Sequence, residues 1–143
     1  SGVLMATVER ITPDTLHLLE RIAEDVFDDR IDFGHLTAML ATGTHVLLVA
    51  VEDGCTVGQC LGMVHHGADR PPMLYLDNLG VTPALRQRGI GRALVEAMFR
   101  VGREMGCAGG WLGVDPDSDS ALPFYRALGL PLRTASFAEF DLR

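Results

Sequence analysis

The sequence of 143 residues contains no lysine, only three cysteines and no long apolar run. A P-loop needs a lysine after its last glycine to reach the phosphates of a nucleotide, so the lack of lysine excludes that class of site. A membrane-spanning helix needs about 20 consecutive apolar residues, and no segment comes near that length. The N-terminus also lacks the charged-then-apolar pattern of a secretory signal. We therefore expect a protein with no membrane partner.

The cysteines and the net charge exclude further classes of protein. Cys55, Cys60 and Cys107 show no spacing typical of a metal or redox site, and an odd number of thiols cannot pair completely within one chain. Reduced thiols, a cytoplasmic location and no bound metal are the simplest interpretation. The net charge of −7 argues against a general nucleic-acid-binding protein.

The hydrophobic pattern predicts alternating strands and helices, which places the chain in the α/β class with α+β character. No linker or repeat interrupts it, so residues 1–143 are expected to form one domain with its own core. Gly80 indicates a distortion near the end of the fourth strand. The expected strands cover residues 4–11, 45–51, 56–66, 73–81, 110–114 and 137–142, and the expected helices cover residues 13–27, 33–41, 89–105 and 120–128.

Acidic side chains occupy one side of the expected helix 13–27 and the turn that follows it. Such a run is commonly a solvated face. Alternatively, the end of the helix and the turn line a site for a cationic amine. The residues concerned are Glu20, Glu24, Asp25, Asp28, Asp29 and Asp32.

The segment 86–92 lies between a strand and a strongly amphipathic helix. Gly89 and Gly91 leave backbone N–H groups bare at the start of this helix, where unpaired donors and the helix dipole favour an anion. A dinucleotide fingerprint would need a third glycine where Leu94 stands, so that class is excluded. The pattern predicts a cradle for a pyrophosphate, with positive charge from Arg86, Arg88 and Arg92.

Two further stretches carry polar groups in informative places. Asp77 and Asn78 interrupt an otherwise apolar strand, where polar groups are costly unless they are hydrogen-bonded or functional. The run D-P-D-S-D-S from Asp115 invites a calcium-loop interpretation, but Ser120 and Arg126 stand where that loop needs glycine and glutamate. We therefore exclude a calcium site and leave the role of Asp77 open between structure and catalysis.

Two motifs together resemble those of the GNAT superfamily of N-acetyltransferases. The first is R-x-x-G-x-G from Arg86, and the second runs from Ser118 through Ala121 and Tyr125 to Gly129-Leu130. The resemblance implies a single GNAT-type domain with a mixed, mostly antiparallel sheet of six to seven strands flanked by about four helices. It also implies direct attack of an amine on acetyl-CoA in a ternary complex, without a metal.

The resemblance further implies roles for individual residues. Asp77 would be the base that removes a proton from an amine of pKa ~10, and Tyr125 would protonate the departing thiolate. The Leu79 N–H would stabilise the oxyanion. Ser118 stands where relatives carry an asparagine. The implied cofactor-binding residues are Leu79, Val81, Arg86, Gln87, Arg88, Gly89, Ile90, Gly91, Arg92 and Ser118.

The acceptor is the least defined part of this reaction. Within the superfamily the sequence is most similar to small aminoglycoside 3-N-acetyltransferases, through the acidic stretch 115–119 and the ending Phe140-Asp141-Leu142. Their strand aspartate, however, aligns better with Asn78 than with Asp77. Polyamines, other small amines and protein N-termini or lysines remain open as acceptors.

A non-catalytic CoA-binding sensor is the alternative class, although the presence of both Asp77 and Tyr125 favours an enzyme. Dimers are common in the superfamily, so a homodimer is one state that the resemblance allows.

Overall fold

The computed structural model describes residues 5–143, which divide into two compact units. The first, here called the sheet unit, ends at Gly113 and contains every strand that the structure describes. The second, the C-terminal unit (Val114–Arg143), contains the helix α3 (Ala121–Ala127). No helix in the described part of the chain is long and apolar enough to cross a bilayer.

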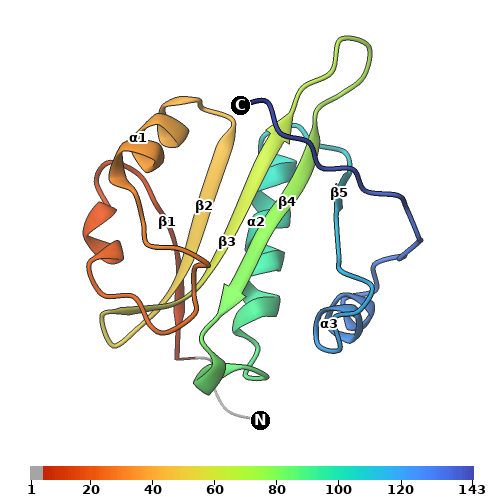
Figure 1. Cartoon of the computed structure of the whole chain (residues 1–143). Coiled ribbons are helices and arrows are strands. Elements are labelled where there is room, and N and C mark those ends of the chain that lie inside the picture. Colours follow the sequence, from red (N-terminus) through yellow and green to blue (C-terminus); the bar gives the residue numbers. More distant parts are fainter. Residues whose placement is uncertain (1–4) are drawn as a thin grey trace. The chain divides into compact units, whose positions relative to one another are not determined.

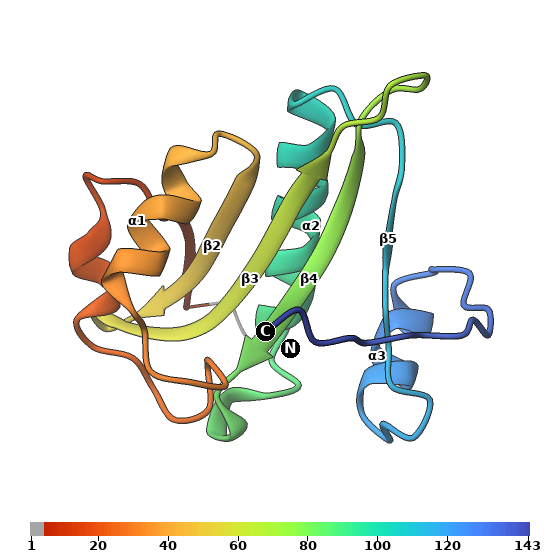
Figure 2. The ribbon, with the colours of Figure 1, turned by 45° about the horizontal axis from the view of Figure 1, so that its top comes forward.

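The sheet unit is built on a five-stranded sheet with the order β1-β2-β3-β4-β5 (Figures 1 and 2). The first four strands are antiparallel neighbours, whereas β5 runs parallel to β4. A parallel pair needs a long crossover, and the helix α2 (Ile90–Glu104) supplies it. The strands are β1 (Thr7–Arg10), β2 (His45–Glu52), β3 (Cys55–His65), β4 (Met73–Val81) and β5 (Gly110–Leu112).

A tight hairpin joins the second and third strands. Asp53 and Gly54 connect β2 to β3 with φ angles of 52° and 71°. Positive φ at both central residues is the geometry of the tight turn that matches the twist of a hairpin, which is why Asp-Gly is favoured there.

The helix α2 packs on one face of the sheet and presents the predicted apolar stripe to it. Leu94, Val95 and Met98 are completely buried. Gly62 on β3 allows the close approach, since a Cβ there would lie 2.6 Å from the Sδ of Met98. Gly106, with φ of 91°, follows the helix, and the Cys107 N–H donates to the Gly102 carbonyl at 2.9 Å. This bond belongs to a Schellman motif, which ends the helix.

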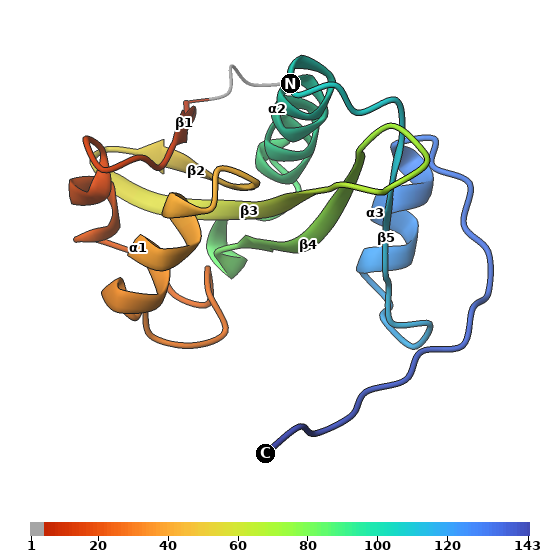
Figure 3. The same cartoon turned by 90° about the horizontal axis from the view of Figure 1, so that it is seen from above.

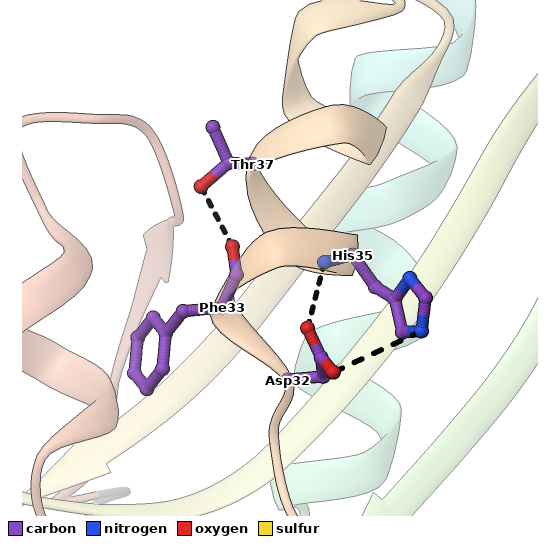
Figure 4. Close-up of polar contacts among 4 residues, drawn as sticks. All are labelled: Asp32, Phe33, His35 and Thr37. Carbon is purple, nitrogen blue, oxygen red and sulfur yellow. Dashed lines mark hydrogen bonds and ion pairs between the residues drawn. The ribbon is translucent and has the colours of Figure 1, made fainter.

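The 3-10 helix η1 (Leu16–Leu19) and α1 (Phe33–Ala41) cover part of the other face of the sheet, over its first strands. Figure 3 shows α1 and α2 on opposite faces. Asp32 caps α1, because its Oδ1 accepts from the His35 N–H at 2.9 Å (Figure 4). This bond to the His35 N–H is the main reason that the pKa of Asp32 is lowered. The buried residues of this core cluster are Ile11, Leu19, Leu36, Leu47 and Val49.

The expected helix 13–27 was wrong. Only η1 is helical there, and Ile22 instead forms an isolated parallel bridge with Thr56. Thr56 donates its N–H to the Arg21 carbonyl and accepts from the Ala23 N–H, both at 2.8 Å. Asp25 then adopts a positive φ of 57°, which no α-helix accommodates. The apolar spacing matched a helix, but pairing with a residue far along the chain determined the backbone.

The expected numbers of strands and helices were also too high. The described residues form five strands and three α-helices, rather than six to seven strands and about four helices. The predicted strand 137–142 is irregular, and Phe137, Phe140 and Leu142 are 88%, 78% and 90% exposed. Phe137 and Phe140 are three residues apart, so a strand would point them to opposite faces. The first strand begins at Thr7, and the expected start at Leu4 lies outside the described residues.

Candidate active site

The centre of the candidate site is the C-terminal half of β4, which separates from β5. The pairing of the two strands ends at Leu76 with Leu112, while β4 continues alongside β3 to Val81. Opposite β3, Asn78 pairs with Leu61 and Leu76 pairs with Gly62, so Asp77 is an extra residue in β4. This arrangement is a β-bulge, a device that redirects side chains beside active sites.

Gly80 marks a close contact rather than the predicted distortion. It pairs regularly with Gln59, and the irregularity of the strand falls instead at the Asp77 bulge. A Cβ on Gly80 would collide with the backbone carbonyl oxygen of Val26. Gln59 donates from Nε2 to the same carbonyl at 3.3 Å, while its buried Oε1 has no hydrogen-bond partner. The loop around Val26 is therefore held directly against β4.

The backbone of β4 beyond the bulge turns alternate groups away from β3. The Thr82 N–H donates to the Val57 carbonyl on β3 at 2.9 Å. Since successive residues of a strand direct their backbone groups to opposite edges, the N–H groups of Leu79 and Val81 face away from β3. Arg86 confirms this direction, because its Nε reaches the Val81 carbonyl at 3.1 Å.

The segment 86–92 forms a turn followed by the start of α2. Gln87 and Gly89 have positive φ values of 64° and 86°. Backbone turns of this kind bring successive N–H groups to one side and form anion-binding concavities. Ile90 and Gly91 open α2, where N–H groups have no intrahelical acceptor. The predicted arginines are all exposed: Arg86, Arg88 and Arg92.

An aromatic cluster that the sequence analysis missed lies beside Asp77. The rings of Tyr75 and Trp111 stack with centroids 5.1 Å apart, and His65 meets Trp111 edge-on at 5.7 Å. Burial raises the pKa of Tyr75, and the charge and hydrogen bonding of the exposed Asp77 carboxylate raise it further. The tyrosine and the single tryptophan of the chain were visible in the sequence. Their pairing follows only from the register of β4 with β5.

A cavity of about 560 Å³ lies in the loop between η1 and α1. Its wall includes Val26, which contacts Gly80 of β4, and the half-exposed ring of Phe33. Asp25 and Asp29 of the predicted acidic stretch also line it, together with Arg30. The acidic loop and the free half of β4 are therefore neighbours.

The remaining predicted residues belong to the C-terminal unit. Tyr125 is buried on α3, with its ring edge-on to Phe124 at 5.0 Å. The Oγ of Ser118 accepts from the Ala121 N–H at 3.1 Å, so this serine serves the predicted helix start. The sheet unit thus contains Asp77, Leu79, Val81 and the segment 86–92. The other two predicted residues, Ser118 and Tyr125, belong to the C-terminal unit.

The two buried thiols are poor nucleophiles, and the described residues contain no cluster of metal-ligating side chains. Burial raises the pKa of Cys60 to about 12 and also raises that of Cys107. Both thiols are therefore protonated near neutral pH, and a protonated thiol is a poor nucleophile. Within residues 5–143, no group of three or more His, Cys, Asp or Glu side chains could hold a metal ion.

Solved structures define the class of fold. An aminoglycoside acetyltransferase from an uncultured soil metagenomic sample, crystallised with trehalose, superposes with a TM-score of 0.83, at 22% identity over 97% of both chains. The aminoglycoside N-acetyltransferase AAC(6')-Iy in complex with CoA gives a TM-score of 0.76, at 21% identity over 96% of this chain and 99% of that one. The chain therefore has the fold of these acetyltransferases.

Sequence comparisons identify the family of the chain. The profile of the acetyltransferase (GNAT) family matches residues 9–130, so the chain belongs to this family. The aminoglycoside N(6')-acetyltransferase type 1 of Salmonella typhimurium is 29% identical over 103 residues, which cover 64% of this chain and 71% of that protein.

Membership of the family confirms the predicted chemistry. The protein is an acyltransferase that transfers the acetyl group of acetyl-CoA to an amine nitrogen. Two of the relatives named above, the Salmonella protein and AAC(6')-Iy, carry the 6′ designation, whereas the motifs had been most similar to 3-N-acetyltransferases. The family alone does not fix the acceptor.

Proposed function

We propose that this N-acetyltransferase acetylates a primary amine of a cationic small molecule of the aminoglycoside kind. The observation that carries the proposal is the cavity of the η1–α1 loop, which is lined by two carboxylates, Asp25 and Asp29, and one arginine, Arg30, and adjoins β4 through Val26. Carboxylates at its wall would attract ammonium groups and hold one amine near the thioester. The names of the relatives support the same class of acceptor.

The proposed reaction uses the free half of β4. Asp77 takes a proton from the acceptor ammonium, and the neutral nitrogen then attacks the thioester carbonyl carbon. The N–H of Leu79, which faces away from β3, donates to the oxyanion. The C–N bond forms and the tetrahedral intermediate collapses with cleavage of the C–S bond. The thiolate of CoA takes a proton from Tyr125, and the nitrogen releases its second proton, which returns through solvent to the Tyr125 phenolate.

The proposed cofactor site continues from β4 into α2. Backbone N–H groups at the start of the helix bind the pyrophosphate, and the arginines screen its charge. Val81 contributes a backbone contact to the pantetheine arm, and Ser118 replaces the usual asparagine contact. The residues assigned to this site are Leu79, Val81, Arg86, Gln87, Arg88, Gly89, Ile90, Gly91, Arg92 and Ser118.

The proposal also covers the cellular compartment, the domain organisation and the partners of the enzyme. All three cysteines are free, as in a reducing compartment, so we assign the enzyme to the cytoplasm. We further propose a single catalytic domain over residues 1–143, a homodimer, and no nucleic-acid or membrane partner.

The proposed acceptor is tested by measuring CoA release from acetyl-CoA with three amines: the aminoglycoside sisomicin, the polyamine spermidine and a lysine-containing peptide. We expect the highest kcat/KM with sisomicin. A preference for the peptide would contradict the proposed acceptor and indicate a protein N-acetyltransferase.

The base is tested with the same assay on Asp77→Asn. We expect kcat to fall about 100-fold, because general-base catalysis contributes roughly that factor or more. Asp14→Asn, which changes another exposed aspartate away from β4, is the matched control. Unchanged turnover in Asp77→Asn would leave proton removal to water.

A further inference from the structure

The stacked pair of Tyr75 and Trp111 lies on the sheet face that α2 does not cover, with Tyr75 partly buried and Trp111 exposed. Leu74 and Leu76 are buried on the α2 side, where the Leu74 side chain lies against Gly102. Because side chains alternate along a strand, Tyr75 between them points to the opposite face. Trp111 stacks on Tyr75 there and remains 43% exposed. Tyrosine and tryptophan are enriched at binding interfaces, where one ring offers a large contact area.

The surroundings keep the ring of Trp111 accessible. Gly109 and Gly113 lie two residues to either side of Trp111, just before and just after β5. A Cβ at either glycine would meet nothing within 4 Å, and neither has a positive φ. Neither crowding nor backbone conformation demands glycine at these positions. Their effect is to leave open space beside the tryptophan.

The ring also lies between the proposed base and a cavity. Asp77 is two residues along β4 from Tyr75, or about 7 Å at ordinary strand spacing. In the other direction, Trp111 and His65 line a cavity of about 420 Å³ that extends to Asp69 and Arg70 of the β3–β4 loop. A molecule with an amine at Asp77 and several linked rings would extend over Trp111 toward this cavity.

We propose that Trp111, held by its stack on Tyr75, is a platform for a saturated ring of the acceptor and selects ring-borne amines over acyclic ones. Such a ring presents C–H groups and attached ammonium groups, and both interact favourably with an aromatic face. The stack with Tyr75 fixes the indole before binding, which reduces the entropy lost on association. This inference rests on the proposed function, since it specifies the acceptor of the same site.

The single tryptophan makes the platform directly observable, because all indole fluorescence of the chain comes from Trp111. We expect sisomicin to change this fluorescence saturably, while spermidine, a polycation without rings, does not. The Trp111→Leu variant should raise KM for sisomicin about tenfold, the upper range for an aromatic stacking contact. Its kcat/KM for spermidine and its KM for acetyl-CoA should stay within about twofold of the wild-type values.

Two variants keep the test specific. Trp111→Phe retains a ring and should show a smaller rise in KM for sisomicin than Trp111→Leu. Phe137→Leu changes an aromatic residue that is 88% exposed and should leave the kinetics unchanged. Equal losses for sisomicin and spermidine in Trp111→Leu would indicate a structural role and overturn the platform.

The results separate this inference from the proposed function. Acetylation of sisomicin without a fluorescence change, and with unchanged KM in Trp111→Leu, would overturn the platform but leave the proposed acceptor standing. A saturable fluorescence change without acetylation would overturn the proposed acceptor and leave a ring-binding site. The absence of both responses would overturn both proposals.

Discussion

The two faces of the sheet differ in how completely they are covered. On the face that α2 covers, apolar side chains of the helix such as Leu94 and Met98 are fully buried. Glycines on β3 allow the helix to lie close to the sheet. On the opposite face, η1 and α1 pack over the first strands, while Asp77 and Trp111 farther along are exposed. The same strands supply the covered face and the open face. Neighbouring residues of a strand such as β4 point to opposite faces of the sheet.

This difference separates stability from chemistry within one sheet. The covered face supplies the apolar burial that holds the sheet unit together. The open part of the other face carries a carboxylate, a phenol and an indole, which would be costly to bury without partners. We therefore expect changes on the covered face to affect mainly unfolding, and changes on the open face to affect mainly turnover.

The largest effect is expected from Met98→Ala on the covered face. Removing a fully buried methionine side chain leaves a cavity and should lower the free energy of unfolding by about 3 kcal/mol. Urea denaturation measures this change, and KM for acetyl-CoA should be unaffected. Met63→Ala is the matched control, because Met63 pairs with Tyr75 on the other face and is only partly buried. Equal losses of stability in the two variants would remove the contrast between the faces.

A smaller effect is expected from Gly80→Ala, which tests the contact between β4 and the acidic loop. The new Cβ would press on the Val26 carbonyl, and backbone atoms move less readily than the end of a side chain. We expect a loss of about 2 kcal/mol in unfolding free energy, together with a raised KM for the amine. Gly62→Ala is the comparison, since its new methyl meets side-chain atoms of Met98, which can shift more readily than backbone, and should cost less than Gly80→Ala. The reverse order of the two losses would contradict this account.

The next effect concerns Tyr75→Phe on the open face. The variant keeps the ring that supports Trp111 but removes the hydroxyl that interacts with Asp77. Because burial and Asp77 raise the pKa of this phenol above its ordinary value of 10.0, the hydroxyl is protonated throughout the neutral range. We expect kcat to change about threefold, as for the loss of one hydrogen bond. A kcat profile that lost a limb near neutral pH in this variant would show that the phenol itself titrates there.

The smallest effect is expected from Asp32→Ala at the start of α1. The pKa of Asp32 in the folded protein is below its ordinary value of 3.8, so the cap contributes fully above that value. This contribution is lost as the pH falls through the lowered pKa. Thermal unfolding should therefore show a reduced Tm for the variant at pH 7, with the two proteins converging in strong acid. Asp14→Ala serves as the control, and a difference in Tm that did not depend on pH would contradict the capping role.

Local signals in the sequence predicted much of the fold. The apolar run from His45 and the mixed run from Met73 became β2 and β4, and the helices over 33–41 and 90–104 are confirmed. Each of these elements has a continuous period and recognisable ends, such as Asp32 before α1 and Gly106 after α2. The GNAT motifs depend on the same short-range spacing, which is why the family and its cosubstrate could be predicted.

The errors arose where distant residues determine the backbone. Residues 21–23 pair with Thr56, so a segment with helical spacing became an extended bridge. The same dependence hid the bulge at Asp77, since an extra residue in a strand is defined only against its partner.

The sequence by itself therefore determined the order of most elements, the R-x-x-G-x-G turn and the chemistry of the family, because these depend on residues close together along the chain. The tertiary structure decided which edge of β4 is free, which acidic residues surround a cavity and which two aromatic rings stack beside Asp77. Those features depend on register and loop closure between segments tens of residues apart, which only long-range packing can set.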